Sequence, residues 1–245
     1  MRAYLIRIGV DQAFGGWNAP MDPTTNEFVY VPIPEGRAMH TKLATPYTAI
    51  GPALAGFATK LPGARRADVC LPRQLTTQNM HLDPDFAELT YGDSGVRRGR
   101  DLTSLGTGDF VAFYGGLKPV VECGHRLVYA LLGLYRVDEV LRAGAVSVER
   151  WRTNAHTRCV NLEPSDVIIR AAASASGRLK RCIPIGEFRD RAYRVQRHVL
   201  AEWGGLSCRD GYLQRSAVLP AMLNAQRFMR WFERQKPQMI SANNL

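Results

Sequence analysis

The chain has 245 residues, which is long enough for one large domain or two small ones. Hydrophobic residues make up 46% and charged residues 22%, a composition that excludes a disordered chain, a collagen and a coiled coil. The net charge is +10, and the 32 basic residues divide into 27 Arg and 5 Lys. Because arginine binds phosphates and guanine edges through paired hydrogen bonds, this balance indicates a nucleic-acid or nucleotide partner. Codon bias in a GC-rich genome is the alternative explanation.

The five cysteines are widely spaced and form no C-x-x-C pair. A structural zinc site needs clustered ligands and a disulfide framework needs paired cysteines, so we expect reduced thiols in a cytoplasmic protein. Arg7 interrupts the N-terminal apolar run, which has no cleavage site, and we expect no signal peptide. The uncharged stretch 43–59 contains Pro46 and Pro52, which argues against a membrane span.

The N-terminal part of the chain predicts two strands and an irregular segment. The apolar run Ala3–Val10 predicts the first strand, and Phe28–Ile33, closed by Pro34, predicts the second. Residues 46–64 contain several prolines and glycines among alanines and leucines. We therefore expect a loop there, with at most one short helix.

The middle of the chain predicts a curled, antiparallel sheet. Asp109–Tyr114 alternates as a half-buried strand does. Arg126–Val137 is a long run of apolar, β-branched and aromatic residues, in which Gly133 predicts a bulge or a barrel corner. Asp166–Ala173 predicts a further strand.

The C-terminal part predicts one helix. Apolar residues of Ala221–Gln235 recur at helical spacing, Pro220 suits the first turn, and Pro237 stops the helix. No linker or repeat divides the sequence, so we expect a single domain over 1–236 and a loose tail over 237–245. The predicted fold class is α+β, with a curled, mostly antiparallel β-sheet, peripheral helices and a C-terminal helix.

The densest polar cluster is His81-Leu82-Asp83-Pro84-Asp85. In an extended backbone His81, Asp83 and Asp85 project to one side, because side chains alternate along a strand. An imidazole and two carboxylates on one face suit a divalent metal or general acid–base chemistry. The alternative is structural: the two aspartates start a turn or cap a helix that begins near Phe86.

Asp11, Gly15, Gly16 and His156 are weaker candidates. Asp11 stands where the first predicted strand ends, close to the Gly15-Gly16 pair, which indicates either a tight turn or the wall of a pocket. An Asx-turn is the alternative reading of Asp11. His156 lies in a polar stretch just before a predicted strand, where it is either a ligand or base, or a surface histidine.

A basic stretch precedes the C-terminal helix, with seven basic residues against Glu187 and Asp190 between positions 178 and 197. The basic residues are Arg178, Lys180, Arg181, Arg189, Arg191, Arg194 and Arg197. Phe188 and Tyr193 stand among them, and cations with aromatic rings suit a nucleic-acid strand. A solvated surface, paired locally with the two acidic residues, is the alternative.

Several catalytic motifs are missing from the sequence. It contains no nucleophile elbow, Walker loop, H-E-x-x-H or dinucleotide fingerprint, which gives no support to serine-hydrolase, ATP-driven and zincin chemistry. The zinc-deaminase signature also fails, because no histidine has a P-C-x-x-C partner. The sequence therefore names no particular metal or cofactor, and it leaves the oligomeric state open.

An ordered set of short motifs runs through the chain. They are Ile6–Gly9 with Asp11 and Gly15-Gly16, Pro32-Ile33-Pro34, His81 to Asp85, Gly108 to Gly115, Gly133 to Val137 followed by His156, and Arg215-Ser216 with Leu219-Pro220. In this order they resemble the third type of the nucleotide-modification-associated domain family. The strand signature alone also resembles PUA-like and EVE-type modules, small curled β-barrels that bind modified bases or RNA. This resemblance implies a PUA-like barrel as the alternative to an open curled sheet.

The resemblance implies a role in making or handling hypermodified DNA bases. It adds Tyr114 and Ser216 to Gly15, Gly16 and Asp85 as expected substrate-binding residues. The chain departs from the family pattern at the segment 91–93 and at Gly116, which indicates a different substrate pocket.

Our leading hypothesis from the sequence is an enzyme that acts on a base or nucleotide, with Asp11, His81, Asp83 and His156 in one catalytic pocket. Asp83 then serves as the acid–base group, His81 orients it or shares a metal, and Asp11 binds a sugar or base edge. The alternative is a non-catalytic reader of modified DNA or RNA, in which the same pocket only recognises the base. A structural partner within a modification complex is the third reading.

Overall fold

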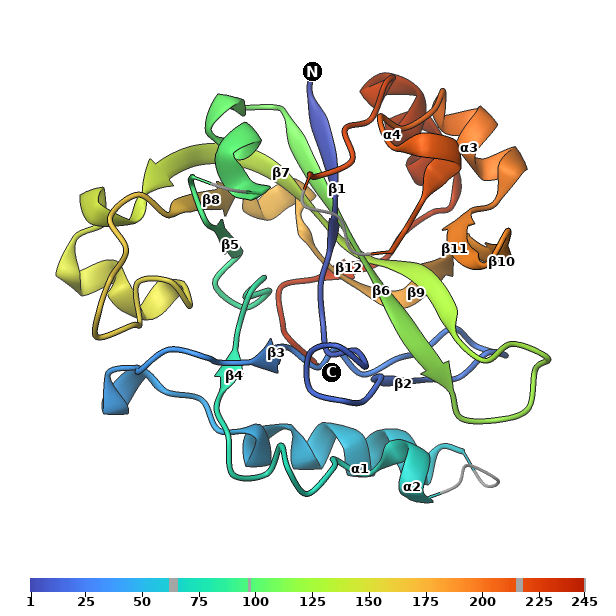
Figure 1. Ribbon diagram of the computed structural model, residues 1–245, viewed down its shortest axis with the longest axis horizontal. Helices are drawn as coiled ribbons and strands as arrows, with labels where there is room; N and C mark the ends of the chain where they lie inside the picture. The colour runs from blue at the N-terminus through green and yellow to red at the C-terminus, as the bar shows by residue number, and fades with distance from the viewer. Residues whose placement is uncertain (62–65, 97, 215–217, 245) are drawn as a thin grey trace.

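The computed structural model describes residues 1–61, 66–96, 98–214 and 218–244 (Figure 1). The strands are β1 Ala3–Arg7, β2 Pro20–Met21, β3 Ile33–Pro34, β4 Met80–His81, β5 Thr90–Asp93, β6 Phe110–Pro119, β7 Val128–Arg142, β8 Val167–Ala171, β9 Gly177–Pro184, β10 Gly186–Arg189, β11 Ala192–Val195 and β12 Met239–Ile240. The α-helices are α1 Gly51–Thr59, α2 Arg66–Val69, α3 Arg197–Trp203 and α4 Ala225–Arg234. Short 3-10 helices cover Thr41–Leu43, Tyr47–Ile50, Arg98–Ser104, Ala143–Ala145, Val148–Thr153, Ala173–Ala175 and Arg209–Gly211.

A large mixed sheet organises the fold. Its main path runs β1-β6-β7-β8-β5, with β2 beside β6, β9 beside β7 and β12 beside β9. β1 and β2 lie parallel to β6, and the other pairs of this sheet are antiparallel. Within the described part of the chain no pairing joins β1 to β5, so the sheet stays open. The predicted mixture of sheet and helices is confirmed, and the PUA-like barrel is not.

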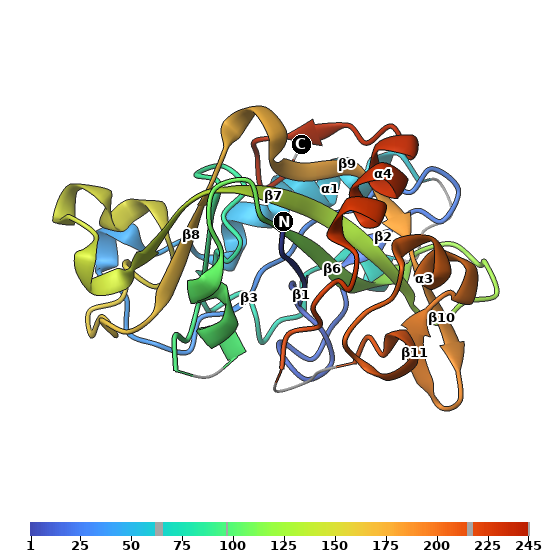
Figure 2. The same cartoon turned by 90° about the horizontal axis from the view of Figure 1, so that it is seen from above.

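The predicted pair of antiparallel strands is present as β6 and β7, and β7 crosses the molecule towards β8 (Figure 2). The register shifts beside Gly133, at the point where a bulge is expected. A Cβ on Gly133 would come within 2.6 Å of the Phe86 ring and 2.7 Å of the Gly177 carbonyl oxygen. Only glycine fits there without displacing its neighbours, because real Cβ atoms do not approach so closely.

β6 is buried on both faces, rather than on one face as the alternation of 109–114 predicts. Phe110 and Phe113 are both 0% exposed. Phe110 stacks on Phe228 of α4, with ring centroids 5.4 Å apart. Phe113 packs edge-on against Phe86 and Tyr135. The central strand therefore carries apolar and aromatic residues on both faces from Phe110 to Tyr114, as strands covered on two sides do.

The two ends of the chain differ from the sequence prediction. Residues 28–31 are buried but form only a bridge to Met21, and the second predicted strand is reduced to β3. α4 begins at Ala225 instead of near Pro220, because the Asn224 side chain caps it by accepting a hydrogen bond from the Arg227 amide. The C-terminal residues are not a loose tail, since β12 pairs with β9.

The helices cover separate parts of the sheet. α1 and α2 lie below it in Figure 1, and α3 and α4 pack together at its upper right. The predicted loop over 46–64 thus contains one nine-residue helix, and positions 62–64 fall outside the described residues. No described helix has the length and apolar character that a membrane span requires. All five cysteines are free thiols.

Candidate functional site

The pairing of β3 with β4 brings His81 to Glu35. Ile33 lies opposite His81 in this antiparallel pair, and Glu35 follows β3 directly. The Nδ1 atom of His81 lies 2.6 Å from Oε2 of Glu35. The carboxylate thus holds one ring nitrogen of His81 and leaves Nε2 to face the centre of the site.

The carboxylate of Asp83 is held by a backbone amide of β5 and by a side chain from a later loop. Its carboxylate is buried, and Oδ1 accepts hydrogen bonds from the Gly92 amide at 2.7 Å and from the Asn154 side chain at 3.4 Å. The Asp83 amide donates to the carbonyl of His81 at 2.8 Å. These contacts leave Oδ2 of Asp83 pointing towards the two histidines.

His156 comes from a distant segment and is also held by a carboxylate. Its Nδ1 lies 2.5 Å from Oδ2 of Asp166, and its amide donates to Oδ1 of Asn154. The ring packs over Gly92, where a Cβ would come within 2.5 Å of the His156 Cδ2 atom. Any larger residue at position 92 would therefore push His156 away.

Three donor atoms converge at the centre of this arrangement. The Nε2 atoms of His81 and His156 lie 3.7 and 3.5 Å from Oδ2 of Asp83. The two imidazole rings meet edge-on, with centroids 5.2 Å apart. All three donor atoms lie within 4.8 Å of one another, which is a spacing that can hold a metal ion.

Arg37 connects the two outer carboxylates. Its Nη1 lies 3.2 Å from Oδ2 of Asp166, and its Nε lies 3.9 Å from Oε1 of Glu35. The Arg37 amide also donates to Oε1 of Glu35 at 2.9 Å. We call the set of Glu35, His81, Asp83, His156 and Asp166 the His–Asp cluster.

The charges of the His–Asp cluster are strongly coupled. Burial opposes the charge on His156, but its contacts with Asp166 and Asp83 outweigh burial and raise the pKa of His156 to about 9. Burial also opposes the charge on Asp83, yet contacts with both histidines hold the pKa of Asp83 below its ordinary value. The carboxylate of Asp83 therefore stays ionised beside the two histidines.

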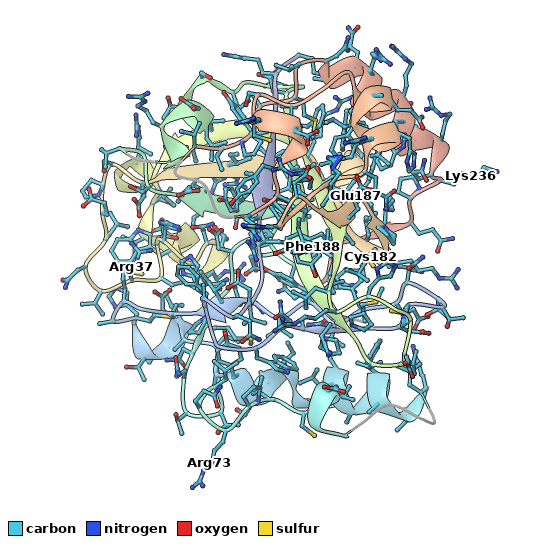
Figure 3. The ribbon with its side chains drawn as sticks, turned by 45° about the vertical axis from the view of Figure 1, so that its right-hand side comes forward. Arg37, Arg73, Cys182, Glu187, Phe188 and Lys236 are labelled. Carbon is cyan, nitrogen blue, oxygen red and sulfur yellow. The ribbon has the colours of Figure 1, made fainter. Side chains whose placement is uncertain are left out.

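A cavity of about 650 Å³ opens over the His–Asp cluster. We call it the His–Asp cavity. Among its lining residues are His81, Asp83, His156 and Asp166, together with Arg7, Phe14, Arg37, Tyr91 and Asp93. Arg37 is labelled at the left of Figure 3.

Asp11, Gly15 and Gly16 lie in a loop beside this cavity. Asp11 does not line the cavity: its Oδ1 accepts hydrogen bonds from the amides of Ala13 and Phe14, both at 2.8 Å, and its Oδ2 pairs with Arg7 at 2.9 Å. Gly15 and Gly16 adopt φ angles of +96° and +66°, which a loop this tight requires. The loop thus positions Arg7 and Phe14, which do line the cavity.

Asp85 and Tyr114 form contacts within the fold and do not line the His–Asp cavity. Asp85 is 2% exposed and pairs with Arg158 at 2.6 Å, while its Oδ1 caps the turn at Ala87. Its side chain therefore does not share one face with Asp83. Tyr114 is buried and donates to the carbonyl of Leu213. Ser216 lies outside the described residues.

The basic stretch divides into buried, paired and exposed residues. Arg178 is 0% exposed and donates to the carbonyls of Leu179 and Ala242, and burial lowers its pKa to about 10. It cannot reach a polyanion, so the predicted nucleic-acid surface loses this residue. Arg189 and Arg194 both pair with Asp210, at 3.1 and 3.8 Å. The exposed members are Lys180, Arg181, Arg191 and Arg197.

A second cavity of about 680 Å³ lies next to this stretch. We call it the aromatic cavity, because Trp17, Phe188 and Tyr193 line it together with Lys118 and Arg126. Phe188 is 66% exposed and is labelled in Figure 3.

The two cavities are connected through stacked side chains. The Arg7 guanidinium, which lines the His–Asp cavity, lies 5.3 Å from the centroid of the Tyr129 ring. Tyr129 in turn stacks on Tyr193 of the aromatic cavity, with centroids 4.3 Å apart. The loop of Asp11 also serves both, since it supplies Phe14 to one cavity and Trp17 to the other.

Sequence reasoning missed two residues of the His–Asp cluster and two residues that contact it. Glu35, Arg37, Asn154 and Asp166 have no local motif that marks them. Glu35 follows the Pro32-Ile33-Pro34 element, and Asp166 starts a predicted strand, but neither position indicates a histidine partner. Only the three-dimensional pairing identifies them.

Comparison with known proteins assigns the chain to a family. No curated protein and no solved structure matches it. A family model described as nucleotide modification associated domain 3 matches residues 2–236, and the chain belongs to this family.

Proposed function

We propose that the protein is an enzyme that modifies a base or nucleotide, and that the reacting group is held at the His–Asp cluster. The observation that carries this proposal is that the donor atoms of His81, Asp83 and His156 converge where these residues line the His–Asp cavity. Membership of a nucleotide-modification family supplies the substrate class. Burying several ionisable groups together is costly, so such clusters are frequent at functional sites.

The His–Asp cavity suits a single base or nucleotide. Its volume of about 650 Å³ lies within the range of about 300–1,000 Å³ that small-molecule sites occupy. Arg7 and Arg37 offer donors for a phosphate or a polar base edge, and Phe14 and Tyr91 offer aromatic surface. A base within a duplex cannot reach a buried cluster, so we expect a free nucleotide, a single strand or a flipped base as the substrate.

Within this proposal the residues have distinct roles. The inner donor atoms of His81, Asp83 and His156 contact the reacting group, directly or through a shared cation. Glu35 and Asp166 are positioning residues, since each holds the outer nitrogen of one histidine. This arrangement keeps both Nε2 atoms aimed at the substrate side of the cluster.

The experiment that tests the function is nucleoside mass spectrometry after incubation with nucleotides, single-stranded DNA, RNA or duplex DNA. We expect a mass change in one nucleoside with the wild-type protein and none with His156→Asn. The matched control is His198→Asn, which changes an exposed histidine of α3 and leaves the reaction intact. Equal product from the wild type and His156→Asn would contradict the assignment of the reacting site.

A reader function is the second candidate, and the aromatic cavity favours it. Trp17, Phe188 and Tyr193 line it beside Lys118 and Arg126, and aromatic rings with cations are the combination that single-stranded nucleic acids bind. In an enzyme the same cavity would bind the nucleotide next to the one that reacts. The two candidates differ in whether the nucleic acid carries a new modification when it is released from the protein.

Replacement of Phe188 by alanine is expected to weaken the binding of a single-stranded oligonucleotide. Its ring is 66% exposed, and loss of stacking on one base costs about 1–3 kcal/mol, or about 5- to 150-fold in Kd. Fluorescence anisotropy with a labelled oligonucleotide measures the change. Val148→Ala, which removes another exposed apolar side chain outside both cavities, is the control. An equal loss in both variants would exclude a specific role of Phe188.

A further inference from the structure

We propose that His81, Asp83 and His156 bind one divalent transition-metal ion, through the two Nε2 atoms and one carboxylate oxygen. The role of this ion in catalysis rests on the proposed function, but its binding does not. The remaining coordination positions of the ion face the His–Asp cavity, which the same three residues line.

The separations of the donor atoms fit a metal better than direct hydrogen bonds. The Nε2 atoms lie 3.7 and 3.5 Å from Oδ2 of Asp83. Usual hydrogen bonds between such atoms measure about 2.7–3.2 Å. Ligands bound about 2.1 Å from a tetrahedral ion lie about 3.4 Å apart, which is close to both separations from Asp83. All three donor atoms lie within 4.8 Å of one another.

The outer contacts prepare both histidines as ligands. Glu35 and Asp166 contact the Nδ1 atoms of His81 and His156. In the neutral imidazoles, Nδ1 then carries the proton and Nε2 carries the free electron pair that a metal needs. Two such electron pairs then face the ionised carboxylate of Asp83. Three electron-rich atoms repel one another unless a metal ion or protons on the imidazoles lie between them.

The net charge of the His–Asp cluster together with Arg37 matches a divalent ion. Glu35, Asp83 and Asp166 carry three negative charges, and Arg37 contributes one positive charge by pairing with the two outer carboxylates. With neutral imidazoles the sum is minus two, which one divalent ion neutralises. The competing arrangement is one proton on each imidazole, and metal binding would displace both protons.

The donor set indicates the class of metal. Imidazole ligands suit zinc, iron, cobalt and nickel, whereas magnesium and calcium prefer sites made of oxygen alone. Two histidines and one carboxylate hold zinc in hydrolases and iron(II) in non-haem oxygenases, and both classes keep coordination positions open for substrate or water. The number of open positions separates the two, because zinc sites favour four ligands and iron(II) sites favour six.

The test is metal titration of the chelator-treated full chain with Zn²⁺, Co²⁺, Mn²⁺ and, under anaerobic conditions, Fe²⁺. We expect saturable binding of one ion per chain by calorimetry and elemental analysis. The visible spectrum of the Co²⁺ form reports whether the ion has four or six ligands. Bound metal should also raise the melting temperature of the wild type.

Variants locate the binding site. Asp83→Ala should weaken binding by more than the about 10- to 100-fold expected for Glu35→Gln or Asp166→Asn, which change only the outer carboxylates. The two milder variants keep the test valid if Asp83→Ala fails to fold. His198→Ala, at an exposed histidine, should bind as the wild type does. No saturable binding by the wild type, or equal affinity in all the variants, would overturn the inference.

The metal site and the proposed function can fail separately. One bound ion per chain without any modified nucleoside leaves the metal site in place and removes the function. Modification at an unchanged rate by the metal-free protein, in the presence of a chelator, excludes a catalytic role of the ion and leaves the function standing.

Discussion

Replacement of Asp83 by asparagine is expected to lower the rate of modification by at least about 100-fold, the low end of what a positioned acid–base group contributes. Asparagine has nearly the same shape, and its carbonyl oxygen can still accept the hydrogen bond from the Gly92 amide. It removes the negative charge, however, and places an amide NH₂ between two histidine nitrogens. The variant therefore loses the one atom that both histidines share.

The measurement is the initial rate of product formation, with circular dichroism to verify the fold. Asp138→Asn makes the same chemical change at an exposed position and should keep the wild-type rate. A wild-type rate in Asp83→Asn would exclude Asp83 as a reacting group. A rate lost equally in both variants would indicate a general effect of the substitution instead.

The sequence indicates part of this site because two of its residues share one short motif. Strand alternation places His81 and Asp83 on the same side, and the structure has both at the His–Asp cavity. The same rule fails at Asp85, whose carboxylate turns to Arg158 and to the backbone of the next turn. Pattern reasoning cannot distinguish these outcomes, because Arg158 lies 73 positions further along the chain.

Long-range pairing also explains the missed residues. Glu35 and His81 are 46 positions apart in the chain, and they meet because β3 pairs with β4. Asp166 lies only ten positions from His156, but nothing in the intervening polar stretch predicts that the loop folds back. The family resemblance is confirmed over residues 2–236, and it marks motifs rather than their partners.

The fold follows the same division between local and distant information. The strands β6 and β7 are predicted from their apolar runs. The bulge is predicted from the position of Gly133 within β7. The burial of β6 on its second face depends on α4, which lies more than a hundred residues further along the chain. β12 is missed because a two-residue strand has no periodicity, and its pairing with β9 is purely tertiary.

Replacement of Asp85 by alanine is expected to lower the free energy of unfolding by about 3–5 kcal/mol, because it leaves the buried Arg158 charge without its partner. Asp85 and Arg158 are 2% and 6% exposed, and their charged atoms lie 2.6 Å apart. The carboxylate also accepts a hydrogen bond from the Asn243 side chain, which ties down the C-terminal segment. Denaturant-induced unfolding, followed by circular dichroism, measures the change.

A double variant separates the loss of the pair from the burial of a lone charge. Combining Asp85→Leu with Arg158→Met removes both charges, and apolar replacement of a buried pair is often neutral or stabilising. We therefore expect the double variant to recover much of the stability that Asp85→Ala loses. Asp138→Ala, at an exposed position, should change the free energy of unfolding by less than about 0.5 kcal/mol. If Asp85→Ala unfolds like that control, the pair of Asp85 with Arg158 does not stabilise the turn beside the His–Asp cluster.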